Sequence, residues 1–442
     1  MKKNALIKGT LLLTAAGLAS RFIGFFYRIF LSRMFGEEGM GIYELMNPVL
    51  ALTFALATSG IQSAISKFVA SEPESRPHNR LRILLSGLVF SGLLSAACTV
   101  FVYRGADFIA GSLLREPRCA PLLRIAALSF PAACIHSCIN GYYYGIKKAG
   151  LPAFCQLFEQ TSRVGSVFLF WSYARQNQIT FSINVAAVGL VIGEIASTLV
   201  AIPMAWLHFA RMRSNVPSPK SPYAVIMRRI FLFAAPLSAN RVCLHLLGAV
   251  ESARIPVSLQ QFGYNQKQAL SIYGVFTGMA MTCILFPSAL TNSVSVLLMP
   301  LVAEADASHN RPAIRSAILK CIRYCLLLGC LCMAVFFLTG DFMGTLLFDS
   351  QLAGHFIRTL SFICPFLYLN TTLFSILNGL GKTGYTFLLN MLSLLIRLGF
   401  VFFAIPLFGI RGFLWGMLAG QLMMALSSFL LLRPYIRESP IH

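Results

Sequence analysis

The sequence predicts an all-α polytopic membrane protein with about twelve transmembrane helices in two pseudo-symmetric six-helix lobes. Of its 442 residues, 57% are hydrophobic and only 12% are charged, whereas soluble domains are about 45–50% apolar and about 25% charged. The apolar residues fall in long runs, and each run reaches the roughly 20 residues that span a bilayer. A soluble enzyme, a disordered chain and a coiled coil are therefore excluded.

The apolar runs and the polar residues between them place the helices in chain order. The expected spans are 8–32, 42–68, 82–103, 121–146, 152–174, 183–208, 229–253, 268–299, 316–339, 356–380, 384–406 and 410–432. The first run follows Lys2 and Lys3 like a signal peptide, but it continues through Arg21 and Arg28, so we expect an uncleaved helix.

The longest polar link, Arg211–Tyr223, contains three prolines and divides the helices six and six. We therefore expect an N-terminal lobe at 1–210, a cytoplasmic inter-lobe linker at 211–227 and a C-terminal lobe at 228–442.

The basic residues indicate how the chain is oriented. With both termini in the cytoplasm, 21 of the 36 lysines and arginines lie on the cytoplasmic side, five lie within spans and 10 lie outside. This bias predicts a multi-pass membrane protein with both termini in the cytoplasm. It also accounts for the net charge of +21 without a nucleic-acid partner.

The twelve cysteines lie mostly within the expected spans, where they act as small apolar residues. They show neither paired CxxC motifs nor Cys/His ligand spacing, so we expect no metal site and no disulfide framework. No nucleotide-binding loop or catalytic motif is found either, so we expect no cofactor and no enzymatic activity.

The two halves resemble each other at offsets of 220–234 residues, in the same order along the chain. The matches are Lys8/Arg228, Arg21/Arg241, Tyr43/Tyr273, Ser63/Ser293, His78–Arg80/His309–Arg311, Lys148/Lys382, Gly150/Gly384, Arg163/Arg397, Gly189/Gly416, Gly193/Gly420 and Glu194/Gln421. Repeats with an even number of helices share one orientation and place substrate sites between the lobes, which is typical of transporters. We expect the paired glycines to mark close helix contacts.

Charged residues within spans are costly and usually functional or paired. Arg21 and Arg28 share one helix face, as do Arg241 and His245 in the equivalent helix. Arg397 stands alone in the eleventh span. For Arg28, snorkelling toward the interface is the alternative to a binding role.

The intramembrane acids are fewer. Glu159, Glu194 and Glu251 are candidates for ion coupling. Two structural alternatives stay open: Glu159 and Arg163 neutralise each other, and Glu194 only forms a hydrogen bond across a close helix contact. We interpret His136 as a core histidine.

Five intramembrane arginines with few acids favour an anionic ligand, because guanidinium binds phosphate bidentately and stays charged in an apolar setting. We expect Arg21, Arg28, Arg241 and Arg397 to line one water-filled cavity between the lobes, rather than each facing its own carboxylate.

Residues 19–35 (ASRFIGFFYRIFLSRMF) resemble the first helix of the multidrug/oligosaccharidyl-lipid/polysaccharide (MOP) flippase superfamily. Residues 57–70 and 273–304 resemble its stage V sporulation protein B branch of polysaccharide-biosynthesis proteins, which is related to lipid II flippases. The resemblance implies a MATE-like pair of six-helix bundles with alternating access. Arg21 matches the first arginine of the lipid II flippase motif, Tyr27 stands at the second, and Arg28 follows it. Their acidic residue falls near Glu44, which becomes a further ion-coupling candidate.

The residues and the resemblance together predict a monomeric flippase or exporter that uses alternating access. Its substrate would be a polyprenyl-pyrophosphate-linked oligosaccharide or peptidoglycan precursor, bound by Arg21, Arg28, Arg241, Arg397 and His245. Its partners would be this lipid-linked anionic sugar and membrane lipid. The alternative is a cation-coupled multidrug (MATE-type) antiporter, for which carboxylates would be needed in the same place.

Overall fold

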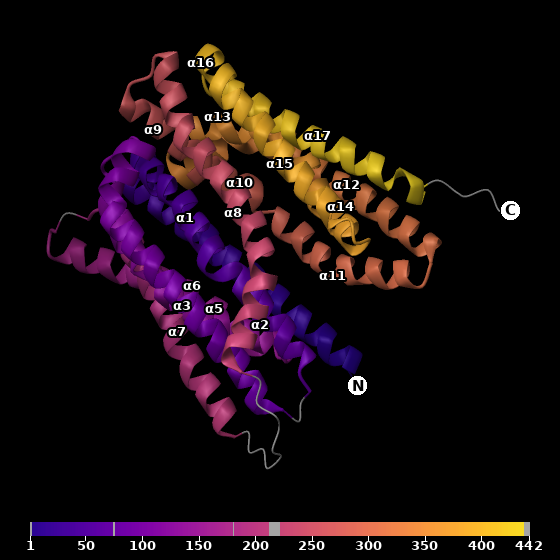
Figure 1. Ribbon diagram of the computed structural model, residues 1–442. Coiled ribbons are helices and arrows are strands. Elements are labelled where there is room, and N and C mark those ends of the chain that lie inside the picture. Colours follow the sequence, from indigo (N-terminus) through magenta and orange to yellow (C-terminus); the bar gives the residue numbers. More distant parts are fainter. Residues whose placement is uncertain (1, 74–75, 180, 212–221, 437–442) are drawn as a thin grey trace. The chain divides into compact units, whose positions relative to one another are not determined.

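The computed structural model describes residues 2–73, 76–179, 181–211 and 222–436, and all regular elements in these ranges are helical (Figure 1). The N-terminal half contains α1 (Lys2–Phe54), α2 (Gly60–Ser71), α3 (Pro77–Phe108), α4 (Cys119–Ala127), α5 (Ser129–Gly145), α6 (Gly150–Gln176) and α7 (Asn184–Ala210). Two π-helical segments, Ala55–Ser59 and Ile109–Leu113, join α1 to α2 and follow α3.

The C-terminal half begins with α8 (Tyr223–Phe262) and α9 (Gln266–Gly274), followed by a π-helical segment, Val275–Ala280. The remaining α-helices are α10 (Met281–Leu285), α11 (Ser288–Ala307), α12 (Arg311–Phe348), α13 (Gln351–Leu360), α14 (Cys364–Gly379), α15 (Thr383–Gly399), α16 (Ile405–Phe408) and α17 (Ile410–Ile436). A 3₁₀ turn (Ser361–Ile363) precedes α14, and a π-helical segment (Phe400–Ala404) precedes α16.

The described residues confirm a multi-pass helical membrane protein. Ten helical segments are long and apolar enough to cross a membrane, or eleven if the bent pair α4–α5 forms one span. The first of these segments, Leu11–Ser71, contains Gly36 with a φ of 66° and a ψ of −171°, so the direction of α1 changes there. Only glycine adopts that backbone conformation readily.

The described chain divides into two compact units. Unit 1 comprises Met1–Gly24 and Leu45–Ala249, and unit 2 comprises Phe25–Glu44 and Val250–His442. Each of the long helices α1 and α8 therefore contributes to both units. The expected boundary between the lobes falls between α7 and α8 instead, and most of the expected linker, 212–221, lies outside the described residues.

Contacts at two glycines explain why Phe25–Glu44 of α1 packs with helices of the C-terminal half, and why the first part of α8 packs with helices of the N-terminal half. A Cβ atom added at Gly60 of α2 would lie 2.2 Å from Ser238 Oγ and 2.6 Å from the carbonyl oxygen of Ala234, so α8 packs closely on α2 in unit 1. In unit 2, a Cβ at Gly274 of α9 would lie 2.3 Å from the backbone nitrogen of Gly41 in α1. Without side chains between them, the backbones approach closely, which favours helix packing in lipid.

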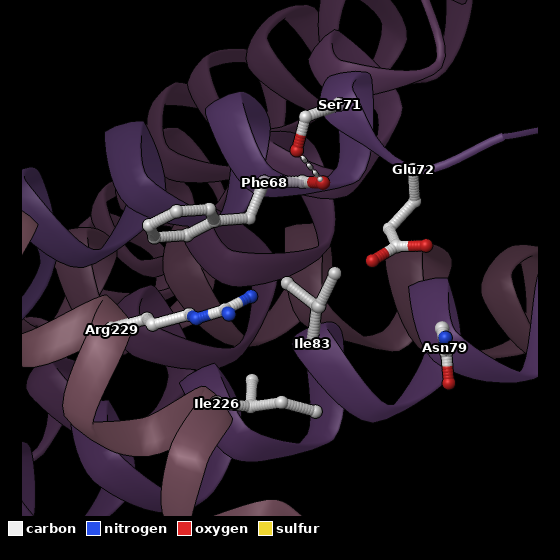
Figure 2. Close-up of a pocket in the computed structure, with 7 residues that line it drawn as sticks. All are labelled: Phe68, Ser71, Glu72, Asn79, Ile83, Ile226 and Arg229. Carbon is white, nitrogen blue, oxygen red and sulfur yellow. Dashed lines mark hydrogen bonds between the residues drawn. The ribbon is translucent and has the colours of Figure 1, made fainter. Parts of the chain in front are cut away.

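The helices of the two units pack in the same pattern. In unit 1, α5 contacts α2, α3 and α7, and in unit 2, α14 contacts α11, α12 and α17. Figure 1 shows α11, α12 and α14 side by side. At one end of α2, α3 and α8, unit 1 also contains a small pocket (Figure 2). All twelve cysteines are free, and nine of them are buried in the described structure.

Candidate functional site

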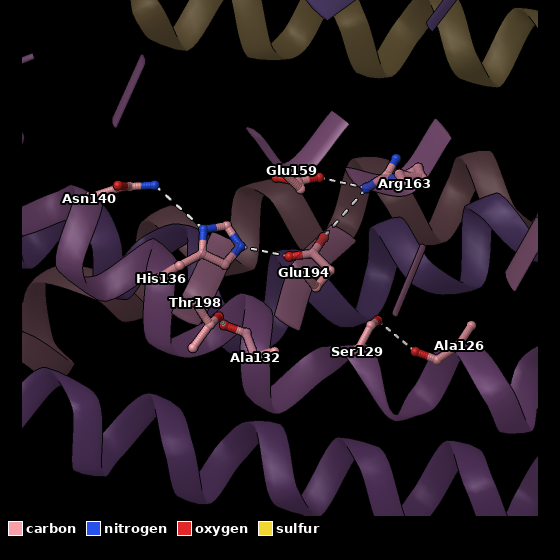
Figure 3. A network of polar contacts seen from close by, with 9 residues as sticks. All are labelled: Ala126, Ser129, Ala132, His136, Asn140, Glu159, Arg163, Glu194 and Thr198. Atoms are coloured by element: carbon pink, nitrogen blue, oxygen red, sulfur yellow. Dashed lines mark hydrogen bonds and ion pairs between the residues drawn. The ribbon is translucent and has the colours of Figure 1, made fainter. Parts of the chain in front are cut away.

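A partly buried polar network connects α5, α6 and α7 in unit 1 (Figure 3). His136 Nε2 lies 2.6 Å from Glu194 Oε2, and Asn140 Nδ2 lies 3.5 Å from His136 Nδ1. A protonated Nε2 donates to the Glu194 carboxylate, and Nδ1 then faces the Asn140 amide. His136 is therefore a hydrogen-bonded core histidine, as the sequence predicted.

Arg163 of α6 completes the network. Its Nη2 donates to Glu159 Oε1 at 2.6 Å and lies 3.7 Å from Glu194 Oε1. The mutual neutralisation of Glu159 and Arg163 is thus confirmed as a contact. The ligand atoms of His136, Glu159 and Glu194 lie within 4.8 Å of one another, a spacing that would suit a metal ion. However, the guanidinium of Arg163 already provides a positive charge beside both carboxylates.

Small residues in α7 allow this arrangement to form. A Cβ added at Gly193 would lie 2.9 Å from the carbonyl oxygen of Glu159, and one at Gly189 would lie 2.3 Å from Val167 Cγ2. The close contact predicted for these glycines is confirmed. It brings Glu194, the residue after Gly193, directly against the polar face of α6.

The second repeat carries uncharged residues at three equivalent positions. At offsets of 227–234, His136 corresponds to Asn370, Glu159 to Ser393 and Glu194 to Gln421. Asn370 Nδ2 donates to Gln421 Oε1 at 2.8 Å and to the Gln421 carbonyl oxygen at 2.9 Å. The hydrogen-bonded pair is therefore kept in both repeats, while its titratable groups are present only in the first.

The glycines of α17 make the contacts expected from the repeat. A Cβ at Gly416 would lie 2.6 Å from Phe400 Cβ, and one at Gly420 would lie 2.7 Å from Ser393 Oγ and 3.6 Å from Arg397 Cγ. The predicted close contact is confirmed here too. Gly420 faces Arg397 as Gly193 faces Arg163.

Arg397 has no glutamates at the positions that correspond to Glu159 and Glu194, and it pairs with Glu251 instead. Its Nε donates to Glu251 Oε1 at 2.7 Å, and its Nη2 donates to Glu251 Oε2. This is the bidentate geometry in which an arginine and a carboxylate interact most strongly. Glu251 is buried in α8, and both residues belong to unit 2.

Arg28 also pairs with an acid within unit 2. Its Nη1 lies 3.0 Å from Oε1 of the buried Glu44 and donates to Thr282 Oγ1 at 3.1 Å. It also donates at 3.4 Å to the carbonyl oxygen of Thr277. Thr277 lies in the π-helical segment Val275–Ala280, and such segments are frequent at functional sites.

Arg21 and Arg241 differ from these paired arginines. Both are exposed residues of unit 1, and neither forms a hydrogen bond or ion pair within the described part of the chain. His245, one turn after Arg241, is exposed as well. The packing of α1 on α6 places Gly24 beside Gln160, where an added Cβ would lie 3.1 Å from Nε2.

The geometry corrects one expectation from the sequence. The four arginines of the predicted cavity were expected not to face carboxylates of their own, and this is wrong for Arg28 and Arg397, because Glu44 and Glu251 neutralise them. Snorkelling of Arg28 is likewise replaced by this ion pair. The placement of the four arginines around one cavity stays a prediction, as does the assignment of Glu44, Glu159, Glu194 and Glu251 to ion coupling.

Sequence reasoning missed the correspondence of His136 with Asn370 and of Glu159 with Ser393. The signal was available, because both pairs share the offset of 234 that relates Arg163 to Arg397.

Solved structures with similar folds are transporters. An inward-facing multidrug resistance MATE family transporter of the MOP superfamily gives a TM-score of 0.72 at 17% identity, over 97% of this chain and 98% of that one. A MOP superfamily transporter from Pyrococcus furiosus with a binding pocket of reverse polarity gives 0.69 at 15% identity, over 98% and 96%. The chain therefore has the MATE transporter fold.

Curated relatives come from Bacillus subtilis (strain 168). Stage V sporulation protein B is 26% identical over 96% of this chain and 83% of its own length. Sporulation protein YkvU is 22% identical over 90% and 88%, and Lipid II flippase MurJ is 22% identical over 70% and 59%.

Two family models match the sequence. The MatE model matches residues 261–403. The model described as Polysaccharide biosynthesis protein matches residues 6–305, which is more than half of the chain. The chain therefore belongs to the polysaccharide biosynthesis protein family.

Proposed function

We propose that this protein is a flippase that translocates a polyprenyl-pyrophosphate-linked oligosaccharide or peptidoglycan precursor across the bacterial cytoplasmic membrane by alternating access. It acts as a monomer with both termini in the cytoplasm, where most of its lysines and arginines would then lie. The curated relatives support transport rather than catalysis, since MurJ is named a lipid II flippase.

The observation that carries the proposal is the contrast among the intramembrane arginines. Arg28, Arg163 and Arg397 are neutralised by glutamates, whereas Arg21 and Arg241 are exposed and have no partner among the described residues. An unpaired arginine facing hydrocarbon is costly. Two arginines kept at equivalent repeat positions therefore support a hydrated, anion-binding surface.

A pyrophosphate group suits such a surface. Each guanidinium donates two parallel hydrogen bonds to a phosphate, and these charge-assisted bonds are roughly twice as strong as neutral ones. Arg21 and Arg241, with His245 beside the latter, would hold the pyrophosphate while the lipid tail stays in the bilayer. Arg28 and Arg397 would join them when the substrate phosphates compete with Glu44 and Glu251 for the guanidinium groups.

We assign ion coupling to the network of unit 1, and the ion is a proton. With His136 neutral, two glutamates and one arginine leave the network with one net negative charge, which a single proton removes. The guanidinium of Arg163 already contacts both carboxylates, and its positive charge disfavours binding of a metal cation there. Asn370, Ser393 and Gln421 cannot titrate, so unit 2 has no equivalent proton site at these positions.

The test is a flipping assay with purified protein in proteoliposomes that contain a fluorescent polyprenyl-pyrophosphate disaccharide. Wild-type protein should expose the probe to a membrane-impermeant quencher, and Arg21→Ala should slow this by about tenfold or more, because a charged hydrogen bond contributes about 1.5–3 kcal/mol. Arg21→Lys should flip the probe at a rate between those of Arg21→Ala and the wild type, because lysine keeps the positive charge but cannot donate two parallel hydrogen bonds to a phosphate.

The matched control is Arg104→Ala, which removes an exposed arginine of α3 at the edge of its expected span. It should flip the probe at the wild-type rate. A normal rate for Arg21→Ala would refute the anion-binding role.

A cation-coupled multidrug antiporter is the second candidate. It is favoured by the carboxylates of the unit 1 network, which a cation-coupled cycle needs, and by the MatE model match. The same proteoliposomes distinguish the two functions, because an antiporter would expel a cationic dye when a proton gradient is imposed and would leave the lipid probe in place.

A further inference from the structure

The pocket in unit 1 lies where α2 ends and where α3 and α8 begin. It is open to the surface, and the space between its walls, together with the solvent at its mouth, is about 380 Å³. Three of the lining side chains are apolar and four are polar. The lining residues are Phe68, Ser71, Glu72, Asn79, Ile83, Ile226 and Arg229.

Two hydrogen-bond acceptors in this wall lack partners. The Oε2 atom of Glu72 and the Oδ1 atom of Asn79 are buried, and neither receives a hydrogen bond within the described structure. Asn79 itself is only 3% exposed. Buried polar atoms are nearly always hydrogen-bonded, so unsatisfied acceptors in a pocket indicate that a donor binds there.

The position of Glu72 is fixed by its neighbour. The buried Arg80 donates to the Glu72 carbonyl oxygen from Nη2 at 2.6 Å and from Nε at 3.2 Å. Because these bonds use the main chain of Glu72, its carboxylate stays available to the pocket. This part of the wall is therefore held in place before any ligand arrives.

A positive charge faces this carboxylate across the pocket. Figure 2 shows Arg229 of α8 and Glu72 reaching toward each other from opposite sides, with Ile83 between and below them. Their side chains form no ion pair in the part of the chain described. The pocket thus presents an anion-binding group and a cation-binding group separated by a gap.

Basic and aromatic side chains surround this pocket. Lys67 Nζ lies 4.0 Å above the Phe233 ring, and the Arg82 guanidinium lies 4.8 Å above the Tyr223 ring. Basic side chains and aromatic rings of this kind are typical of the membrane interface. The apolar residues of the wall would contact the upper part of an acyl chain.

We infer that this pocket binds the head group of an aminophospholipid, with the ammonium on Glu72 and Asn79 and the phosphate on Arg229. A phosphoethanolamine head group carries a donor-rich ammonium and an anionic phosphate on one short linker, which matches the two ends of the pocket. A choline head group has no N–H donor, and a glycerol head group has no positive charge for Glu72. This inference does not rest on the proposed flipping activity.

The test uses the full-length protein in a mild detergent, with native mass spectrometry to count bound lipids. Short-chain phosphatidylethanolamine, phosphatidylcholine and phosphatidylglycerol are titrated separately. We expect one saturable phosphatidylethanolamine per protein, bound about tenfold more tightly than phosphatidylcholine, because a charged hydrogen bond is lost with the methylated amine.

Two variants test which residue binds the ammonium of the head group and which binds its phosphate. Glu72→Gln should reduce phosphatidylethanolamine affinity about tenfold while leaving phosphatidylcholine binding unchanged, and Arg229→Gln should weaken binding of both lipids. The controls are Arg228→Gln, which removes the neighbouring exposed arginine outside the pocket, and Asp306→Asn, which removes an exposed acid of α11. Both should bind as the wild type does.

Three results would overturn the proposal. Equal affinity for the ethanolamine and choline lipids would exclude recognition of the ammonium. A preference for phosphatidylglycerol that Glu72→Gln strengthens would identify a simple anion site. Binding of Mg²⁺ or Ca²⁺ that depends on Glu72 and displaces no lipid would identify a cation site instead.

Discussion

The proton-coupling role of unit 1 can be tested by giving it the residues that unit 2 already has. The double variant His136→Asn/Glu194→Gln copies the Asn370–Gln421 pair, in which the two side chains are joined at 2.8 Å. It removes both titratable groups of the His136–Glu194 hydrogen bond and keeps a donor facing an acceptor. Glu159 and Arg163 remain paired, so the local charge becomes neutral.

The expected magnitudes follow from these contacts. Since one hydrogen bond replaces another, the free energy of unfolding should change by no more than about 1 kcal/mol. Replacing His136 alone with leucine would instead remove a hydrogen-bond donor from the buried Glu194 and destabilise by about 1–3 kcal/mol. For transport, one pH unit is worth 1.36 kcal/mol per proton. A gradient of two units coupled to one proton thus shifts the final distribution of substrate about a hundredfold.

The assay measures flipping in proteoliposomes with and without an imposed pH gradient. Wild-type protein should show the gradient-driven shift, and the double variant should equilibrate the probe without accumulation. Thr198→Val is the matched control, because it removes the 2.7 Å hydrogen bond from Thr198 to the Ala132 carbonyl oxygen beside the network and changes no charge. If the double variant folds normally and still accumulates substrate as the wild type does, the coupling assignment is refuted.

Three further predictions concern packing, pairing and topology. Gly416→Ala should lower the melting temperature, because its Cβ would lie 2.6 Å from a phenylalanine side chain, whereas Gly165→Ala, with no atom within 4 Å, should not; equal melting temperatures would contradict the close contact. Arg397→Ala should destabilise unit 2 by about 3–5 kcal/mol in a denaturation series, and adding Glu251→Ala should recover part of that loss, because the buried carboxylate is no longer stranded. A cysteine at Ser218, in a variant without other reactive cysteines, should react with an impermeant maleimide only from the cytoplasmic side; reaction from outside would invert the topology.

Local patterns in the sequence predict the helices and their close contacts well. Apolar runs of the right length identify the helices, because each span must satisfy its own backbone hydrogen bonds in lipid. The spacing of Gly193 from Gly189, repeated in Gly420 and Gly416, identifies two helix contacts that the structure confirms. Each of these signals can be recognised from the sequence of one helix alone.

Pairings between distant segments could not be predicted in the same way. Glu251 and Arg397 are 146 positions apart, and no local feature of either helix indicates the other. The composition of the compact units could not be predicted either, because a polar, proline-rich stretch of sequence does not indicate which helices pack together. The contacts of Gly60 and Gly274 decide that question, and they depend on which helix lies opposite.

Each unit contains one segment from the other half of the chain, and this has a consequence for biosynthesis. Phe25–Glu44 leaves the ribosome among the first residues, yet the rest of its unit begins only at Val250. Domains generally fold in order of synthesis, but here an early segment must wait in the membrane until the second half of the chain has been inserted. During that interval the backbone around Gly41 lacks its packing partner on α9. Truncated chains that end near Ala249 should therefore be targets for membrane quality control, even though unit 1 is complete.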